Sequence, residues 1–157
     1  MMDLDEVLKL VRAMNDEGVE YITFGAMALW SHGIVRATED ADFFIAPTVE
    51  NVERLKRALR RVWSDPAIDE ITADDLLGDY PAVRYGPPDT EWTFDFLTRL
   101  GEVYSYENLK SQMGEIEGVP IRVVTPRQLY EMKRDTVRHK DRNDAEALRQ
   151  AFSLQED

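Results

Sequence analysis

The chain has 157 residues, of which 43% are hydrophobic and 32% charged, as expected of a globular protein with its own core. It lacks cysteine and has only two histidines, which excludes disulfide scaffolds and thiol nucleophiles and argues against a zinc site. The net charge of −12 argues against nucleic-acid binding over the whole surface, although basic residues gather between positions 122 and 149. That basic segment is either a solvated helix with compensating ion pairs or a surface that meets an anionic ligand.

No apolar run approaches the ~20 residues that a membrane helix needs, and the N-terminal segment is acidic and periodic, unlike a signal peptide. We therefore expect a cytoplasmic protein without a membrane partner. The sequence shows no internal repeat, low-complexity tract or linker, which predicts a single domain over residues 1–157.

The spacing of apolar residues predicts helices and strands in mixed order, which indicates an α/β fold of the α+β type. We expect a mixed central sheet flanked by helices and closed by C-terminal helices. Thr48 is a good cap for one helix, and Thr125 followed by Pro126 is a good start for another. The predicted elements, in chain order, are a helix over 3–17, a strand over 19–24, a short helix ending at Gly33, a strand over 40–46, a helix over 49–63, strands over 82–86 and 91–98, a short helix over 106–113, a hairpin over 114–124, and two closing helices, one from 125 and one over 141–152.

Two aspartates one residue apart, Asp40 and Asp42, lie at the start of the strand predicted over 40–46. Alternate residues of a strand face the same side, so both carboxylates would face one way and the residues between them would face a core. Two such anions on a half-buried strand repel each other and resist desolvation unless a cation lies between them. Mg²⁺ suits this role, because it prefers a few carboxylates together with water and phosphate oxygens. The alternative is an ordinary acidic turn that leads into a strand.

Asp95 interrupts the strongly apolar strand predicted over 91–98, where an unpaired carboxylate is unfavourable. If this strand pairs beside the strand of Asp40 and Asp42, the three carboxylates share one face and can hold two metal ions. Asp95 would then draw the proton from an attacking hydroxyl, directly or through the metal. An ion pair between Asp95 and an arginine such as Arg84 explains this carboxylate equally well.

Gly25 and Ala26 lie between the first predicted strand and the short helix that follows it. At such a turn the backbone N–H groups point outwards and favour an anion, and small side chains let a phosphate approach the main chain. A tight turn without any ligand explains a lone Gly-Ala pair more simply. The sequence favours a phosphate-binding turn only because Asp40 and Asp42 follow Gly25 and Ala26 at a suitable distance along the chain.

The stretch FGAMALWSHGIVRATEDADFFI, with FDF downstream, resembles the polymerase-beta type of the nucleotidyltransferase superfamily. The signature of that superfamily is a hydrophobic residue, Gly, then Gly or Ser, followed by a strand with Asp-x-Asp or Asp-x-Glu and by a third carboxylate on a later strand. The chain is most similar to the small bacterial branch of minimal nucleotidyltransferases that includes the AbiEii-type toxins. Arg36-Ala37-Thr38 matches the Arg-x-Thr of that branch, and KRDTVRHKDRNDAEAL at 133–148 matches its C-terminal pattern. The resemblance spans about residues 19–150.

The resemblance implies a nucleotidyltransferase fold with a catalytic core over 19–98 and a C-terminal helical part over 125–153. It assigns catalysis and metal binding to Asp40, Asp42 and Asp95. The nucleotide-binding residues that it implies are Gly25 and Ala26 in the phosphate-binding turn, Lys133 near the nucleotide phosphates, and Arg36 and Thr38, which would position the nucleotide.

For the other residues of the matching segments, we expect a structural role or leave the role undecided. Asp141 and Asp144 are expected to have a structural role, as acids that cap the last helix. Arg138 and Lys140 face either solvent or substrate. His32 lies on an apolar helix and is expected to be a turn or packing residue rather than a base.

The resemblance implies an enzyme that uses two Mg²⁺ or Mn²⁺ ions to transfer a nucleoside monophosphate from an NTP to a hydroxyl. The acceptor would be a protein side chain, an RNA 3′ end or a small molecule, and a cognate toxin or antitoxin would be the protein partner. Ala26 stands where the family usually has Gly or Ser, and because backbone donors survive this change, we expect weakened rather than lost NTP binding. The alternative hypothesis is a degenerate, non-catalytic interaction module on the same fold.

Overall fold

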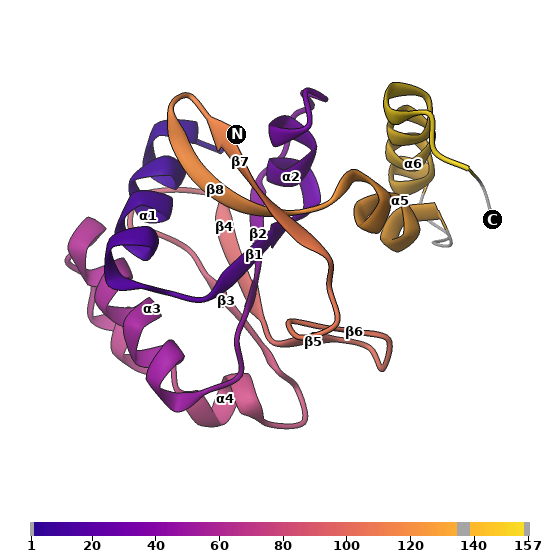
Figure 1. Cartoon of the computed structure of the whole chain (residues 1–157). Coiled ribbons are helices and arrows are strands. Elements are labelled where there is room, and N and C mark those ends of the chain that lie inside the picture. The colour runs from indigo at the N-terminus through magenta and orange to yellow at the C-terminus, as the bar shows by residue number, and fades with distance from the viewer. Residues whose placement is uncertain (1, 135–138, 156–157) are drawn as a thin grey trace.

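A six-stranded mixed sheet is the centre of the structure, a computed structural model that describes residues 2–134 and 139–155 (Figure 1). The described elements, in chain order, are α1 (Leu4–Glu17), β1 (Tyr21–Phe24), α2 (Gly25–Ser31), β2 (Asp40–Ile45), α3 (Val49–Val62), a 3₁₀ helix (Pro66–Glu70), α4 (Ala73–Leu77), β3 (Ala82–Tyr85), β4 (Thr93–Leu97), β5 (Arg99–Leu100), β6 (Tyr104–Ser105), β7 (Ser111–Ile116), β8 (Val119–Val124), α5 (Pro126–Arg134) and α6 (His139–Phe152). The strand order of the sheet is β3-β4-β2-β1-β8-β7, and β5 and β6 form a separate hairpin.

The strands of the sheet run in both directions. β1 is antiparallel to β2 and parallel to β8, and β2 is parallel to β4. The edge strands β3 and β7 are antiparallel to their neighbours β4 and β8. Figure 1 shows α1 and α3 on one side of the sheet and α2, α5 and α6 on the other. The predicted α+β fold, with a mixed central sheet flanked by helices, is therefore confirmed.

Local sequence signals determine the ends of the two long helices beside the sheet. Asp3 caps α1 by accepting hydrogen bonds from two N–H groups of the first turn, and Gly18 ends the helix with a φ of +71°. Thr48 caps α3 as predicted, because its hydroxyl accepts a hydrogen bond of 3.1 Å from the backbone N–H of Asn51. None of the helices in the described part of the chain is long and apolar enough to cross a membrane.

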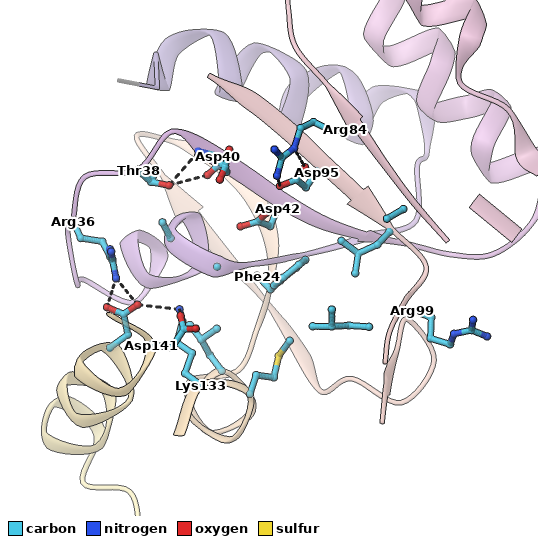
Figure 2. A pocket seen from close by; sticks show the side chains of 18 of the residues that line it. Phe24, Arg36, Thr38, Asp40, Asp42, Arg84, Asp95, Arg99, Lys133 and Asp141 are labelled. Carbon is cyan, nitrogen blue, oxygen red and sulfur yellow. Dashed lines mark hydrogen bonds and ion pairs between the residues drawn. The ribbon is translucent and has the colours of Figure 1, made fainter. Parts of the chain in front are cut away.

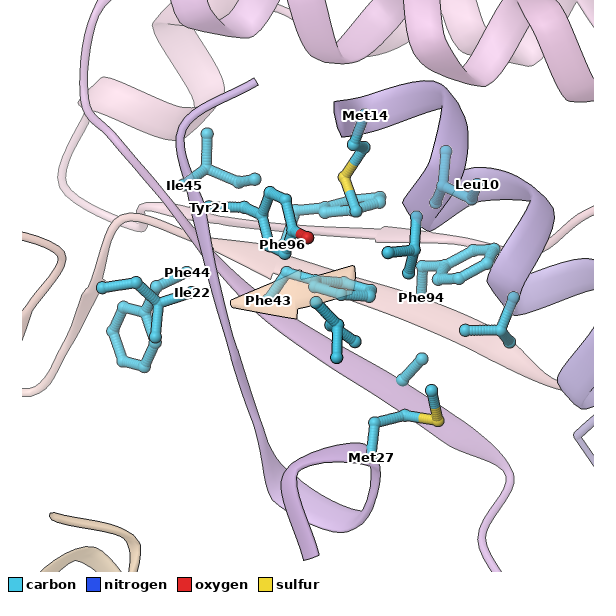
Figure 3. Packing of buried hydrophobic residues seen from close by; sticks show 14 of the residues in the cluster. Leu10, Met14, Tyr21, Ile22, Met27, Phe43, Phe44, Ile45, Phe94 and Phe96 are labelled. Carbon is cyan, nitrogen blue, oxygen red and sulfur yellow. The ribbon is translucent and has the colours of Figure 1, made fainter. Parts of the chain in front are cut away.

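Aromatic side chains of β2 and β4 form the core beneath α1 (Figure 3). The ring of Phe96 lies 5.8 Å from those of Phe43 and Phe94, and all three rings are fully buried. Leu10 and Met14 of α1 are fully buried in the same cluster. Burial of each such side chain contributes roughly 2 kcal/mol, so this aromatic layer holds β2 and β4 firmly together. The alternate residues of both strands then face the opposite side, towards α2 and α5.

The helix predicted over 106–113 is wrong. The segment that begins at Ser111 is strand β7, which pairs with β8 from Ser111 opposite Val124 to Ile116 opposite Val119. Backbone hydrogen bonds to β8 override the local helical preference of this segment. The hairpin of β5 and β6 was likewise not predicted, because two strands of two residues each carry no periodic pattern.

Candidate active site

Four residues form a row across β3, β4, β2 and β1. Arg84 lies opposite Asp95 in the register of β3 with β4. Asp95 lies opposite Asp42, and Asp42 lies opposite Phe24. Side chains directly opposite each other are roughly 5 Å apart at Cβ and share one face of the sheet. The strand of Asp95 is therefore the neighbour of β2, as the prediction required, and Asp40 faces the same side as Asp42.

We call Asp40, Asp42 and Asp95 the carboxylate triad (Figure 2). Two of these acids, Asp40 and Asp95, each interact with a different neighbouring side chain. The hydroxyl of Thr93 donates a hydrogen bond of 2.7 Å to Oδ1 of Asp40. Arg84 forms an ion pair with Asp95, in which Nε and Nη2 lie 2.8 and 3.3 Å from the two carboxylate oxygens. Within residues 2–134 and 139–155, no three His, Asp or Glu side chains converge as a ready-made metal cluster.

The environment of Asp42 strongly perturbs its pKa. Burial, together with the charges of Asp95 and Asp40, raises the pKa of Asp42 to about 7. Its carboxylate lies against the backbone of Gly25, since a Cβ at position 25 would come within 2.3 Å of Oδ2 of Asp42. Gly25 also has a φ of +68°, a conformation that L side chains rarely adopt. The glycine of the predicted phosphate-binding turn thus contacts the predicted metal-binding pair directly.

The other small residue of the turn and the threonine of the Arg-x-Thr motif lie nearby. Ala26 follows Gly25 in the first turn of α2. The hydroxyl of Thr38 donates to the carbonyl oxygen of Asp40 at 3.1 Å and accepts from its N–H at 3.2 Å. Thr38 therefore fixes the backbone at the start of β2, and its hydroxyl is already engaged.

A second charged group, the C-terminal cluster, consists of Arg36, Lys133, Asp141 and Asp144. Nζ of Lys133 lies 2.9 Å from Asp144 and 3.2 Å from Asp141. Nη1 of Arg36 lies 2.5 Å from both carboxylate oxygens of Asp144, although the two residues are 108 positions apart in the chain. The side chain of Asp144 is only 9% exposed, so its two cationic partners offset the unfavourable burial of its charge.

The cluster partly corrects the prediction that two acids cap the last helix. Asp141 lies in the first turn of α6, as expected of an acid near a helix N-terminus. For Asp144 the capping prediction is wrong, because its carboxylate binds Arg36 and Lys133 instead. No local sequence pattern predicts this role of Asp144, because only the fold brings Arg36, on the loop before β2, next to α6.

A pocket of about 670 Å³ opens between the carboxylate triad and the C-terminal cluster. This volume lies within the range of small-molecule sites. The pocket is also lined by apolar side chains, which are those of Phe24, Val83, Leu97, Leu100, Leu129 and Met132. The structure brings together in this one pocket all the site residues predicted from the sequence, which are Gly25, Ala26, Arg36, Thr38, Asp40, Asp42, Asp95 and Lys133.

His32 is a packing residue, as predicted. Its Nε2 donates to the carbonyl oxygen of Val124 at 2.8 Å, and its ring packs edge-on against Phe152 at 5.7 Å between centroids. Burial lowers the pKa of His32, which favours the neutral ring. Arg138 and the side chain of Lys140, which the sequence left undecided between solvent and substrate, lie outside the described residues.

A family model described as the nucleotidyl transferase AbiEii toxin of a type IV toxin–antitoxin system matches residues 24–151. The chain belongs to the AbiEii nucleotidyltransferase family. It is therefore a transferase of a toxin–antitoxin family, as the sequence resemblance implied. A search of curated proteins found no match.

Solved nucleotidyltransferase structures share the fold of this AbiEii-family chain. ANT(2'')-Ia in complex with adenylyl-2''-tobramycin aligns with a TM-score of 0.57 at 15% identity, over 96% of this chain and 90% of that one. A Thermotoga maritima protein described as a nucleotidyltransferase, TM1012, aligns with a TM-score of 0.52 at 14% identity, over 98% and 97% of the two chains. The solution structure of ANT(2'')-Ia aligns with a TM-score of 0.51 at 18% identity, over 98% and 93%. At these identities the likeness establishes the nucleotidyltransferase fold alone.

Proposed function

We propose that the chain transfers a nucleoside monophosphate from an NTP to an acceptor hydroxyl and releases pyrophosphate, with two Mg²⁺ or Mn²⁺ ions as cofactors. The observation that carries the proposal is the shared pocket, which is lined by the carboxylate triad and also by Lys133 and Arg36 with their partners Asp141 and Asp144. Carboxylates suit divalent cations, and a lysine with an arginine suits phosphate oxygens. The two sides of the pocket therefore match the two parts of a metal–NTP complex.

The donor set of the triad fits a hard divalent cation. Asp40, Asp42 and Asp95 offer carboxylate oxygens, which are the ligands that Mg²⁺ prefers. The pKa of Asp42 is raised by burial and by the charges of the other two acids, and a cation among them would relieve this repulsion. When bound, such ions neutralise the charge of the phosphates and activate the attacking hydroxyl.

The polar residues of the pocket then have separate tasks. Lys133 and Arg36, which are paired with Asp141 and Asp144 in this structure, exchange these partners for phosphate oxygens when the NTP binds. Gly25 and Ala26 leave the main chain of the turn accessible to the phosphates, because neither has a side chain beyond Cβ. Asp95, the carboxylate on β4 opposite Asp42, accepts the proton of the acceptor hydroxyl directly or through the metal.

The acceptor hydroxyl belongs to a protein side chain, an RNA 3′ end or a small molecule. ANT(2'')-Ia, which shares this fold, was solved with adenylyl-2''-tobramycin, which supports a small-molecule hydroxyl as one candidate acceptor. The type IV toxin–antitoxin description of the family supports a cognate antitoxin as the protein partner.

Two observations favour the alternative function, a degenerate module that does not catalyse transfer. Ala26 replaces the Gly or Ser that is usual in the turn, and Asp95 is already paired with Arg84. Such a module would keep the fold and its partner but would bind NTP without metal dependence or not at all.

Calorimetric titration of each NTP in the presence and absence of Mn²⁺ separates the two functions. We expect Mn²⁺-dependent NTP binding that is lost in Asp40→Asn and kept in Asp79→Asn, a matched control whose carboxylate lies outside this pocket. A folded wild-type protein that binds no NTP in the presence of Mn²⁺ would overturn the enzymatic proposal and favour the non-catalytic module.

A further inference from the structure

Arg84 is the cation that pairs with the carboxylate triad. Its hydrogen bonds to Asp95 and the charge of Asp95, with smaller contributions from the other two acids, raise the pKa of Arg84. In the described part of the chain, the remaining cations of the pocket form no ion pair with the triad. Arg36 and Lys133 bind the acids of α6, and Arg99 lies away from the triad (Figure 2).

The pair of Arg84 and Asp95 joins an exposed cation to a fixed anion. Arg84 reaches Asp95 from the edge strand β3 with a side chain that is 66% exposed, whereas the side chain of Asp95 is 22% exposed. Asp95 is held in place because β4 pairs with strands on both sides. An exposed ion pair has a small net energy, so the guanidinium can leave Asp95 without disturbing the core.

We propose that Arg84 is the resident counter-cation of the triad, which holds Asp95 in the metal-free protein and releases it when divalent ions bind. Arg84 thereby sets the metal concentration that the site requires. The inference rests on the proposed function, because it assumes that the triad binds divalent ions. In this role Arg84 is a positioning residue that acts through Asp95.

Two effects of Arg84 act in the same direction on metal affinity. Asp95 has to exchange one cationic partner for another, and the guanidinium charge also repels an ion bound to the other two acids. A unit charge about 6 Å from a divalent ion in a medium close to water weakens binding of that ion by about tenfold. Removal of the charge at position 84 should therefore tighten metal binding by about this factor.

A titration of Mn²⁺ without nucleotide, with free Mn²⁺ measured by its paramagnetic resonance signal, tests the inference on the full chain. We expect Arg84→Gln to bind Mn²⁺ about tenfold more tightly than wild type. Arg99→Gln is the matched control, because Arg99 lines the same pocket and is exposed, and its Mn²⁺ affinity should stay within about twofold of wild type. Mn²⁺ should also raise the Tm of Arg84→Gln by more than it raises the Tm of wild type.

The outcomes separate this inference from the proposed function. Equal Mn²⁺ affinities of wild type and Arg84→Gln would overturn the inference and leave the metal-dependent function intact. Weaker binding by a folded Arg84→Gln would overturn it as well, because Arg84 would then support the triad rather than compete with metal. If neither folded protein bound Mn²⁺, the metal-dependent function itself would fail, and the inference with it.

Discussion

Gly25→Ala tests how closely the turn and the carboxylate triad fit together. Alanine at this position must adopt a φ of +68°, which costs about 1 kcal/mol. Its Cβ would lie 2.3 Å from Oδ2 of Asp42, well inside the 3.0 Å that real contacts keep. The carboxylate must therefore turn away from its rotamer, which adds about 1 kcal/mol. We expect a loss of about 2 kcal/mol in the free energy of unfolding, and a transfer rate about a hundredfold lower if the displacement reaches about 1 Å.

Gly18→Ala is the matched control for the backbone contribution. Gly18 has a φ of +71°, and a Cβ added there would meet no atom within 4 Å. Urea unfolding should show a loss of about 1 kcal/mol for this variant, with unchanged NTP binding. In an Asp42→Ala background, which lacks the colliding oxygen, Gly25→Ala should cost no more than Gly18→Ala. Equal losses for the two glycine variants in the otherwise wild-type protein would refute the reasoning.

Two further substitutions test the charges of the pocket by urea unfolding. Burial and the neighbouring carboxylates raise the pKa of Asp42 from 3.8 to about 7, so its ionisation destabilises the fold progressively as the pH rises between these values. Asp42→Asn should therefore raise the free energy of unfolding by on the order of 2 kcal/mol at pH 8 and by less at pH 5, and a loss at pH 8 would contradict this. Asp144→Asn should lower the free energy of unfolding by about 2 kcal/mol, because Arg36 and Lys133 lose a shared counter-charge. The control Asp141→Asn leaves Arg36 paired with Asp144 and should lower the free energy of unfolding by less. Equal losses in these two variants would show that Asp144 does not organise the cluster.

The side of the pocket that carries the triad could be predicted from the sequence because its signals are local. The alternation of Asp40 and Asp42 with buried residues indicates which face of β2 the acids share. The position of Asp95 required a hypothesis about strand pairing, which the register of β2 with β4 confirms. The alternative interpretation of Asp95, an ion pair with Arg84, is also confirmed, and the two are compatible because β3 lies on the far side of β4 from β2.

The C-terminal cluster could not be predicted, because it depends on contacts between distant segments. Arg36 and Asp144 lie on a loop and a helix whose separate patterns carry no sign of each other. An acid near the start of a helix is commonly a capping residue, and this local rule suits Asp141 but not Asp144. Strand β7 was not predicted for the same reason, because pairing with β8, rather than the residues of β7 themselves, determines its conformation.

Nucleotidyl transfer itself is the central claim, and labelling tests it most directly. The protein would be incubated with Mg²⁺ or Mn²⁺, a cell lysate and each NTP labelled at the α-phosphate. The account predicts metal-dependent covalent labelling of an acceptor by wild type and none by a folded Asp40→Asn variant, because the triad would have lost a metal ligand. Labelling by wild type that is no greater than that by Asp40→Asn, or that persists without divalent ions, would contradict the account.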